Sequence, residues 1–210
     1  MRIGILGSGL MGAKLGTLFA RAGHEVTFSY SRSVAKLKRL ARQAKAKYGS
    51  PSDAARNADA VLLAVHWSKM GDVLKQAGSL SGKVVISCSL PMNQDDTALV
   101  IGRTSSGAER LAKKLSKAHF VSAFNTVPSE VLFDVYARKR KAGRPSLVYC
   151  GDDRKAKRVA VRLIRDVGFE PLDAGPLWIA RYTEPFALLV AQLAYEGKGG
   201  PELAYRFQRF

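Results

Sequence analysis

Residues Gly7-Ser8-Gly9-Leu10-Met11-Gly12 join an apolar segment, Arg2–Leu6, to an apolar-periodic segment that begins at Leu10. A G-x-G-x-x-G run between a strand and a helix is typical of the first turn of a dinucleotide-binding fold. There the first glycine permits a tight turn, the second lets the backbone approach a pyrophosphate, and the third allows close helix–strand packing. We therefore expect these six residues to contact a dinucleotide at the N-terminus of the helix. The alternative is a glycine-rich turn that binds no ligand.

The end of the predicted second strand, Glu25–Tyr30, is followed by hydroxyls and cations. An Asp or Glu at this position hydrogen-bonds the ribose 2′-hydroxyl of NAD. This chain instead has Ser31, Arg32, Ser33 and then Lys36, with no carboxylate. Cations and hydroxyls bind a 2′-phosphate through charge-assisted hydrogen bonds, whereas a carboxylate would repel it. The pattern predicts NADP rather than NAD, even if Ser31 or Ser33 also caps the helix that follows.

The composition is that of an ordinary globular protein. The chain has 210 residues, of which 47% are hydrophobic and 24% charged, enough for one core and a small appendage. No apolar run reaches the ~18 residues that span a bilayer, and the first residues form a predicted strand rather than a signal peptide. Cys88 and Cys150 both lie in apolar predicted strands. We therefore expect buried thiols in a cytoplasmic protein, with no disulfide, metal site or membrane contact.

The net charge of +17 is unusual, and it raises the question of nucleic-acid binding. Most of the cations are spread over the polar faces of predicted helices. Only Arg138-Lys139-Arg140-Lys141, together with Arg144, forms a compact cluster. Because no nucleic-acid-binding motif accompanies this cluster, we expect no nucleic-acid partner. The excess positive charge would attract anionic cofactors.

Apolar strand-like runs alternate with amphipathic helical segments for most of the length. This alternation predicts an α/β fold, a Rossmann-type doubly wound and mostly parallel sheet, over residues 1–177. A small C-terminal helical segment, residues 178–210, is expected to belong to the same compact unit. Ligands of such sheets bind at the carboxyl ends of the strands. That rule selects the segments Gly7–Gly12, Ser31–Lys36, His66-Trp67, Ser89-Leu90-Pro91 and Asn125-Thr126-Val127.

The predicted C-terminal helix, Trp178–Tyr195, is apolar on more than one face. A helix of this kind is buried on most of its sides. One face can cover the sheet, and the remainder is then available to a second copy of the chain in a symmetric homodimer. The alternative is that the tail, Leu203–Phe210, covers the helix within one chain.

Several separated strings match one family. They are Gly7–Gly12, Ser31-Arg32, Ala64-Val65-His66-Trp67, Ala123-Phe124-Asn125-Thr126, Cys150-Gly151-Asp152-Asp153 and Leu172-Asp173-Ala174-Gly175-Pro176-Leu177. The chain resembles the NADPH-dependent reductases of the deazaflavin coenzyme F420. More broadly, it is similar to the NADP oxidoreductase domain of STEAP metalloreductases. The resemblance implies hydride transfer between NADPH and a deazaflavin or a flavin.

The resemblance also implies roles for individual residues. Ser8, Ser31, Arg32 and Lys36 would hold the 2′-phosphate. The nicotinamide would lie against Val65, His66, Trp67, Leu90, Pro91 and Asn125, and the second cofactor against Val127, Pro128, Ala174, Gly175 and Pro176. Members of the family commonly have Pro where His66 stands, so the acceptor pocket of this chain differs in detail.

Direct hydride transfer between two rings needs no catalytic triad, carboxylate pair or metal, because the cofactors carry the chemistry. The candidates for catalytic residues are His66 and Asn125. His66 is a proton donor or hydrogen-bond partner, or else a strand-end histidine satisfied by backbone groups. Two other functions stay open: an NADPH-dependent reductase of a small carbonyl or imine substrate, and a non-catalytic NADPH-sensing module.

Overall fold

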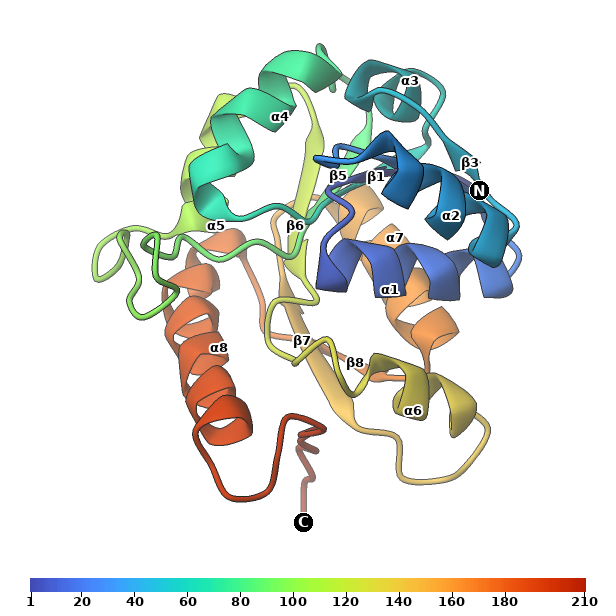
Figure 1. Cartoon of the computed structure of the whole chain (residues 1–210). Coiled ribbons are helices and arrows are strands. Elements are labelled where there is room, and N and C mark those ends of the chain that lie inside the picture. The colour runs from blue at the N-terminus through green and yellow to red at the C-terminus, as the bar shows by residue number, and fades with distance from the viewer.

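Eight strands form one sheet in the order β3-β2-β1-β4-β5-β6-β7-β8. The computed structural model describes residues 1–210, and Figure 1 shows the whole chain. The order β3-β2-β1-β4-β5-β6 is that of a Rossmann fold, which confirms the predicted fold class. The strands are β1 (Arg2–Leu6), β2 (Glu25–Ser29), β3 (Lys47–Tyr48), β4 (Ala60–Leu63), β5 (Val84–Ser87), β6 (His119–Ala123), β7 (Ser146–Cys150) and β8 (Glu170–Asp173).

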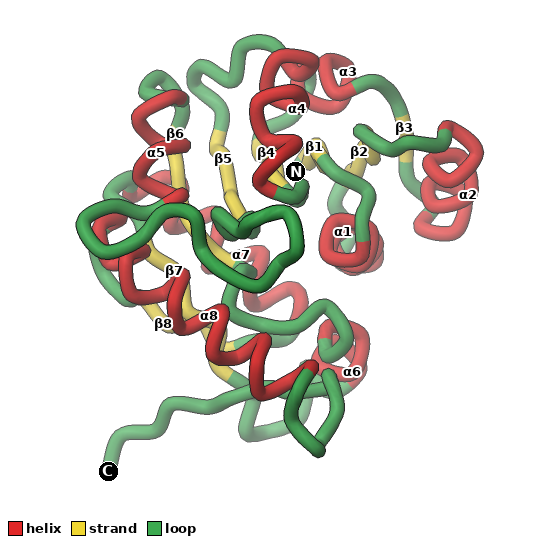
Figure 2. Tube along the Cα trace, turned by 60° about the vertical axis from the view of Figure 1, so that its left-hand side comes forward, coloured by secondary structure: helices red, strands yellow, loops and turns green.

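Helices cover both faces of the sheet, and the strands run between the two helical layers in Figures 1 and 2. A cluster of 30 buried residues joins the sheet to one layer, and a cluster of 18 joins it to the other. The first layer contains α1 (Leu10–Arg21), α2 (Val34–Ala44), α6 (Leu132–Ala137) and α7 (Arg154–Val167). The second contains α3 (Pro51–Arg56), α4 (Met70–Ala77), α5 (Gly107–Lys114) and the first turn of α8 (Ala180–Tyr195), together with the 3₁₀ turns η1 (Trp67–Lys69) and η2 (Leu177–Ile179).

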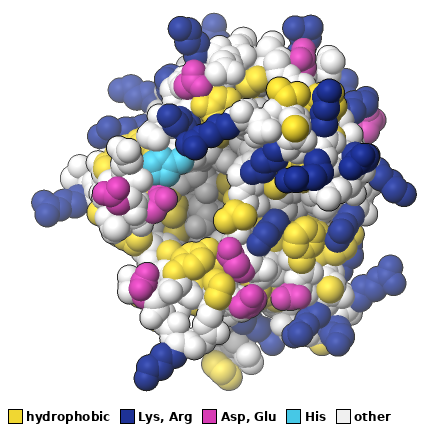
Figure 3. Space-filling view, in the orientation of Figure 1, with side chains coloured by type: hydrophobic (Ala, Val, Ile, Leu, Met, Phe, Trp, Pro, Cys, Tyr) yellow, Lys and Arg dark blue, Asp and Glu magenta, His cyan; other side chains and the backbone are white.

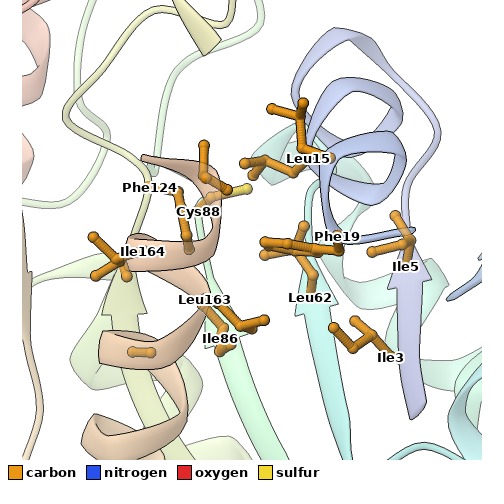
Figure 4. Packing of buried hydrophobic residues seen from close by; sticks show 14 of the residues in the cluster. Ile3, Ile5, Leu15, Phe19, Leu62, Ile86, Cys88, Phe124, Leu163 and Ile164 are labelled. Atoms are coloured by element: carbon orange, nitrogen blue, oxygen red, sulfur yellow. The ribbon is translucent and has the colours of Figure 1, made fainter. Parts of the chain in front are cut away.

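The central strands are buried on both faces. All four residues of β4 and all four of β5 are buried, as expected for parallel strands with helices on each side. Figure 4 shows Phe19 of α1, Leu62 of β4 and Ile86 of β5 packed together in the larger cluster. The rings of Phe19 and Phe124 meet edge to face, with their centroids 6.0 Å apart. This packing fixes α1, and with it the glycine turn, against the carboxyl ends of the strands.

Polar caps set where several helices begin. Ser50 and Asp53 form a capping box at the start of α3, with Pro51 at its first position. The carboxylate of Asp153 accepts a hydrogen bond from Ala156 N at 2.8 Å and caps α7. Asp is one of the residues that commonly cap helices in this way.

The direction of β7 is the main departure from a parallel sheet. β7 pairs antiparallel with β6, with Ser122 opposite Cys150, and β8 pairs parallel with β7. The carboxyl ends of β7 and β8 therefore point toward the edge at which β1, β4, β5 and β6 begin. β8 ends at Asp173, two residues before Gly175, which has a φ of +108° and whose N–H donates to the Asp173 carboxylate at 2.9 Å.

Candidate functional site

The candidate site is a pocket of about 390 Å³ at the carboxyl ends of β1, β4, β5 and β6. In Figure 3 the corresponding face of the molecule is hollowed near its centre, with hydrophobic side chains beside the hollow. The pocket is mostly apolar, as ring-binding sites are. Its walls are Gly9, Leu10, Met11, Ala64, Val65, His66, Cys88, Ser89, Leu90, Met92, Asp96, Asn125, Val127, Pro128, Ser129, Ala187, Val190, Ala191 and Tyr195. Nine of the residues expected from the sequence therefore come together here.

The three glycines of the first turn differ in what surrounds them. A Cβ on Gly7 would collide with the backbone of Ala64, and a Cβ on Gly12 would collide with Gly7 O. Gly7 also has a φ of +120°, which strongly favours glycine. A Cβ on Gly9, by contrast, would meet no atom within 4 Å. The space in front of Gly9 is thus free for a ligand, while Gly7 and Gly12 are required by packing.

The first turn of α1 offers backbone donors next to that free space. Gly9 is the N-cap of α1 and provides no side-chain hydrogen bond. The N–H groups at the start of a helix have no acceptor within the helix, and they carry a partial positive charge. Here they belong to Leu10, Met11 and Gly12. The arrangement fits a pyrophosphate, which binds through such groups.

Ser8 stabilises the turn from inside. It is only 3% exposed, and its hydroxyl donates to Ser29 O at 2.8 Å. Ser8 N also donates to Tyr30 O at 3.2 Å. Its side chain is therefore engaged with β2, which differs from the implied contact with a 2′-phosphate.

Tyr30 holds the end of β2 in an unusual conformation. Its φ is +57°, a backbone region that costs a non-glycine residue about 1–3 kcal/mol and clusters at functional sites. The Tyr30 hydroxyl donates to Asp72 of α4 at 2.6 Å. Burial, followed by the bond to Asp72, raises the pKa of Tyr30 to about 12. The neutral tyrosine thus ties β2 to α4 beside the glycine turn.

The residues expected at the 2′-phosphate lie at the start of α2. Ser33 is the N-cap of α2 and accepts a hydrogen bond from Lys36 N at 3.2 Å, while Ser31 Oγ accepts from Ser33 N at 3.3 Å. The side chains of Arg32 and Lys36 are exposed and form no ion pair. Ser33 therefore caps the helix, and the two exposed cations, with no carboxylate beside them, have the chemistry that suits a phosphate.

His66 connects the end of β4 to the loop that follows β5. Its Nδ1 accepts from Ser68 N at 3.2 Å, and its Nε2 lies 3.0 Å from Asn93 O and 3.1 Å from Asp96 Oδ1. Both ring nitrogens are therefore engaged within the protein. This is the strand-end histidine satisfied by neighbouring groups, although its ring also lines the pocket.

Two of the predicted cofactor contacts lie outside the pocket wall. Trp67 begins η1, directly after His66. Pro91 is buried beneath α5, where a Cβ on Gly107 would lie 3.0 Å from its ring. Leu90, between Ser89 and Pro91, does line the pocket.

Asn125 provides a polar group without a partner. The residue is 8% exposed, and its Nδ2 is buried with no hydrogen bond. An unpaired buried donor costs about 1–3 kcal/mol, so such a group commonly marks a ligand site. Because Asn125 lines the pocket, its amide fits an oxygen of a bound ring cofactor.

Helix α8 closes the pocket, and the sequence reasoning missed this role. Its inner face contributes Ala187, Val190, Ala191 and Tyr195 to the wall. The Tyr195 hydroxyl donates to Glu130 Oε2 at 2.8 Å, which joins the end of α8 to the segment after β6. The signal in the sequence was the apolar character of more than one face of this helix, one of which covers the site.

A buried carboxylate fixes the other end of α8. Glu184 is 1% exposed and accepts hydrogen bonds from Gly107 N and Ala108 N, both at 2.9 Å, at the N-terminus of α5. Burial raises the pKa of Glu184 to about 7. Arg181 donates to both oxygens of Glu109, at 2.9 and 2.7 Å. These contacts hold α8 against α5 and so determine how it faces the pocket.

Ala174, Gly175 and Pro176, which the resemblance placed against the second cofactor, are not among the residues that line this pocket. Gly151 N donates to Gly175 O at 3.1 Å, and a Cβ on Gly151 would lie 3.1 Å from Phe120 O. Gly175 therefore lies level with the middle of β6. The reversed β7 and β8 carry this segment away from the carboxyl end of β6, and α8 takes the place expected for it.

Cys88 lines the pocket as a neutral thiol. Burial raises its pKa to about 12, and its Sγ donates to Leu63 O at 3.2 Å. A thiolate nucleophile is therefore absent from the site. None of the helices has the length and apolar character needed to cross a membrane.

The N-terminal part of the chain matches a known family. Residues 2–91 match the family described as NADP oxidoreductase, coenzyme F420-dependent. This range holds the glycine turn, Arg32 and His66, so the resemblance is confirmed over this part of the chain. A metalloreductase STEAP3 from Rattus norvegicus is 29% identical over 187 residues, which make up 89% of this chain and 36% of the relative. The chain thus spans about a third of the curated relative that it matches.

Solved structures share the fold. A protein from Arthrobacter sp. FB24, proposed to be an F420-dependent NADP reductase, has a TM-score of 0.87 and 22% identity, with both chains fully covered. A hypothetical protein from Sinorhizobium meliloti has a TM-score of 0.75 and 26% identity, over 99% of this chain and 96% of that one. A reductive aminase from Aspergillus terreus, solved with NADPH and ethyl-5-oxohexanoate, has a TM-score of 0.67 and 18% identity, over 91% and 60%. The general class that the family match supports is an NADP-dependent oxidoreductase.

Proposed function

We propose that this chain, whose residues 2–91 match the F420-dependent NADP oxidoreductase family, transfers a hydride between NADPH and a deazaflavin such as coenzyme F420, or a flavin. The observation that carries the proposal is one apolar pocket that begins at the open face of Gly9 and is closed by α8. A pocket of this shape and composition suits two flat rings held against each other. Proximity and orientation then lower the barrier to hydride transfer.

Each group of residues has its own part in this proposal. The N–H groups of Leu10 and Met11 bind the pyrophosphate, while Arg32 and Lys36 bind the 2′-phosphate. The Asn125 amide, which has no partner within the protein, hydrogen-bonds the nicotinamide end. Val127, Pro128 and Ala191 form the apolar wall against which the second ring lies. The bound nucleotide supplies the hydride, and the chain supplies binding, orientation and exclusion of water.

Transfer of a deuterium label tests the reaction. NADPH deuterated stereospecifically at the transferred position is incubated with the protein and oxidised F420. Direct transfer places deuterium on the ring carbon of the reduced deazaflavin, where it does not exchange with water. Label found only in solvent, or no turnover with any deazaflavin or flavin, would remove the proposal.

The second candidate is reduction of a small imine or carbonyl compound by NADPH. It is supported by the likeness in fold to a reductive aminase, of which this chain covers 60%. Small imines and ferric chelates, tested in the same assay, separate this reaction and metalloreduction from ring-to-ring transfer. NADPH binding without turnover of any acceptor would leave a sensing module.

We also propose that residues 1–177 and 178–210 form one unit that dimerises in the cytoplasm. The proposal of a single unit rests on α8, which completes the pocket. The proposal of a dimer rests on one face of the C-terminal helical segment, which exposes four large apolar side chains. These are Trp178, Tyr182, Leu189 and Leu193, which are 45–64% exposed. A contiguous apolar face of this kind suits an interface with a second copy. The cytoplasmic location is supported by two buried free thiols, which are typical of a reducing compartment.

A further inference from the structure

A second hollow, of about 720 Å³, is lined by ten residues, of which five are cations. We propose that it binds a small molecule carrying a phosphate or diphosphate group, and we name it the basic hollow. It shares no residue with the pocket described above, so the proposal does not depend on the reaction. Its walls are Lys139, Arg140, Lys141, Ala142, Gly143, Arg144, Ser146, Glu170, Arg206 and Phe207.

The charges around the basic hollow are unbalanced. Five cations face a single carboxylate, that of Glu170. Arg144 Nη2 forms an ion pair with Glu170 Oε2 at 2.7 Å, and Lys139 Nζ lies 4.0 Å from the centre of the Tyr136 ring. The other three, Arg140, Lys141 and Arg206, have no carboxylate partner. Like charges gathered around a concave surface repel one another and attract an anion.

The two walls of the basic hollow are held together by the C-terminal tail. Ser146 N donates to Tyr205 O at 2.8 Å, and Phe207 N donates to Ser146 Oγ at 3.0 Å. The ring of Tyr205 packs on Phe186 of α8, with centroids 5.1 Å apart. Figure 1 shows this tail at the lower edge of the molecule, below α8. The tail is therefore docked on the start of β7.

Docking of the tail brings Arg206 to the loop between α6 and β7. A Cβ on Gly143 would lie 3.3 Å from Arg206 Nη1. Gly143 has a φ of +77°, so glycine lets the loop turn closely under the guanidinium. Cations from two distant parts of the sequence thus face one hollow before any ligand arrives. Such preorganisation lowers the entropic cost of binding.

The chemistry of the side chains points to phosphate. A guanidinium presents a planar fork of N–H donors that matches two oxygens of a phosphate, and an ammonium adds a point charge. A nucleic-acid surface, by comparison, extends as a stripe of many phosphate contacts. Here the cations surround a concavity bounded by the tail, which suits a small ligand.

Titration calorimetry with inorganic pyrophosphate at constant ionic strength tests the proposal. Replacing the two guanidinium groups that have no carboxylate partner, Arg140→Ala with Arg206→Ala, is expected to weaken binding at least about tenfold, because two charge-assisted hydrogen bonds are lost. The matched control removes Arg110 and Lys114, two exposed cations on α5, and is expected to change affinity less than about twofold. If the first double variant melts at a lower temperature, Lys141→Ala alone replaces it.

Four outcomes would overturn the proposal. Wild-type protein could fail to bind millimolar pyrophosphate. Equal weakening in both double variants would show a general effect of net charge. Loss of binding in Arg32→Asp, but not in the Arg140 and Arg206 variant, would place the anion at the start of α2. Finally, the wild-type protein could bind a short DNA duplex but not pyrophosphate. Loss of that DNA binding in the Arg140 and Arg206 variant would identify a nucleic-acid surface instead.

Discussion

Arg32 lies exposed at the end of β2 with no ion-pair partner, so its charge is available to a 2′-phosphate. We expect Arg32→Asp to weaken NADPH binding by roughly ten- to hundred-fold, because a lost charge-assisted hydrogen bond costs about 1.5–3 kcal/mol. NADH affinity should change little. Arg39→Asp, which removes an exposed cation on α2, the helix that follows Arg32, is the matched control. Fluorescence titration that finds equal wild-type affinities for NADPH and NADH would contradict the assignment.

Gly9 is the glycine whose absent side chain serves a ligand rather than the fold. Because a Cβ there meets no atom within 4 Å, Gly9→Val should keep the circular-dichroism spectrum while NADPH binding falls below detection. Gly71→Val is the control, since a Cβ on Gly71 also meets nothing within 4 Å. A Gly9→Val variant that binds NADPH normally would show that the open space has another use.

Glu184 makes stability depend on pH in a defined direction. Burial raises its pKa from 4.5 to about 7, so between these values the folded protein holds a proton that the unfolded chain has released. The free energy of unfolding from this group therefore falls as pH rises through that window and is constant above it. Glu184→Gln should remove this slope. Urea unfolding at pH 5 and pH 8 measures it, and identical pH differences in wild type and variant would refute the assignment.

Helix α8 closes one side of the site, which would otherwise be an open groove. Ala191 lines the pocket, so Ala191→Trp should fill part of it and reduce turnover of a ring acceptor at least about tenfold through steric overlap. Gln192→Trp places the same side chain at an exposed neighbouring position and should leave turnover nearly unchanged. Steady-state kinetics with F420 or a flavin compares the two, and equal rates would mean that the acceptor does not contact α8.

The proposed homodimer depends on the exposed apolar face of the C-terminal helical segment. Leu189 and Leu193 are 54% and 55% exposed and lie one turn apart, so replacing both with Glu should separate a dimer into particles of 22.8 kDa. The buried charges that result would oppose association. Val34→Glu, at a 61% exposed position on α2, is the control. Light scattering that gives a 22.8 kDa particle for the wild type at micromolar concentration would rule the dimer out.

At the scale of the whole molecule, residues 178–195 contact several neighbours at once. The sequence predicted a helix there, with one face on the sheet and a second for a partner or the tail. In the structure α8 packs on α5, covers the pocket and contacts the tail through Phe186, and it still leaves an apolar strip exposed. The tail therefore covers one part of the helix, and the exposed strip is the surface on which the proposed dimer rests.

The sequence by itself determined the features that depend on neighbouring residues. The glycine turn, the hydroxyls and cations after β2, and the caps at Ser50 and Asp153 each act within a few positions of the chain. Parallel strands buried on both faces read as continuous apolar runs, and helices between them fix right-handed crossovers. The Rossmann-type sheet and the edge at which its first strands end therefore followed from local patterns.

Only the tertiary structure decided the direction of β7 and what followed from it. An apolar run such as Ser146–Cys150 is buried equally well in a parallel or an antiparallel pair, so its composition does not encode its direction. With β7 reversed, Gly175 lies away from the pocket, and α8 lies across it. Arg206 also lies beside the loop 139–144, which no local pattern could anticipate. Contacts between distant segments depend on which edge and direction each strand takes, and these are properties of the assembled sheet.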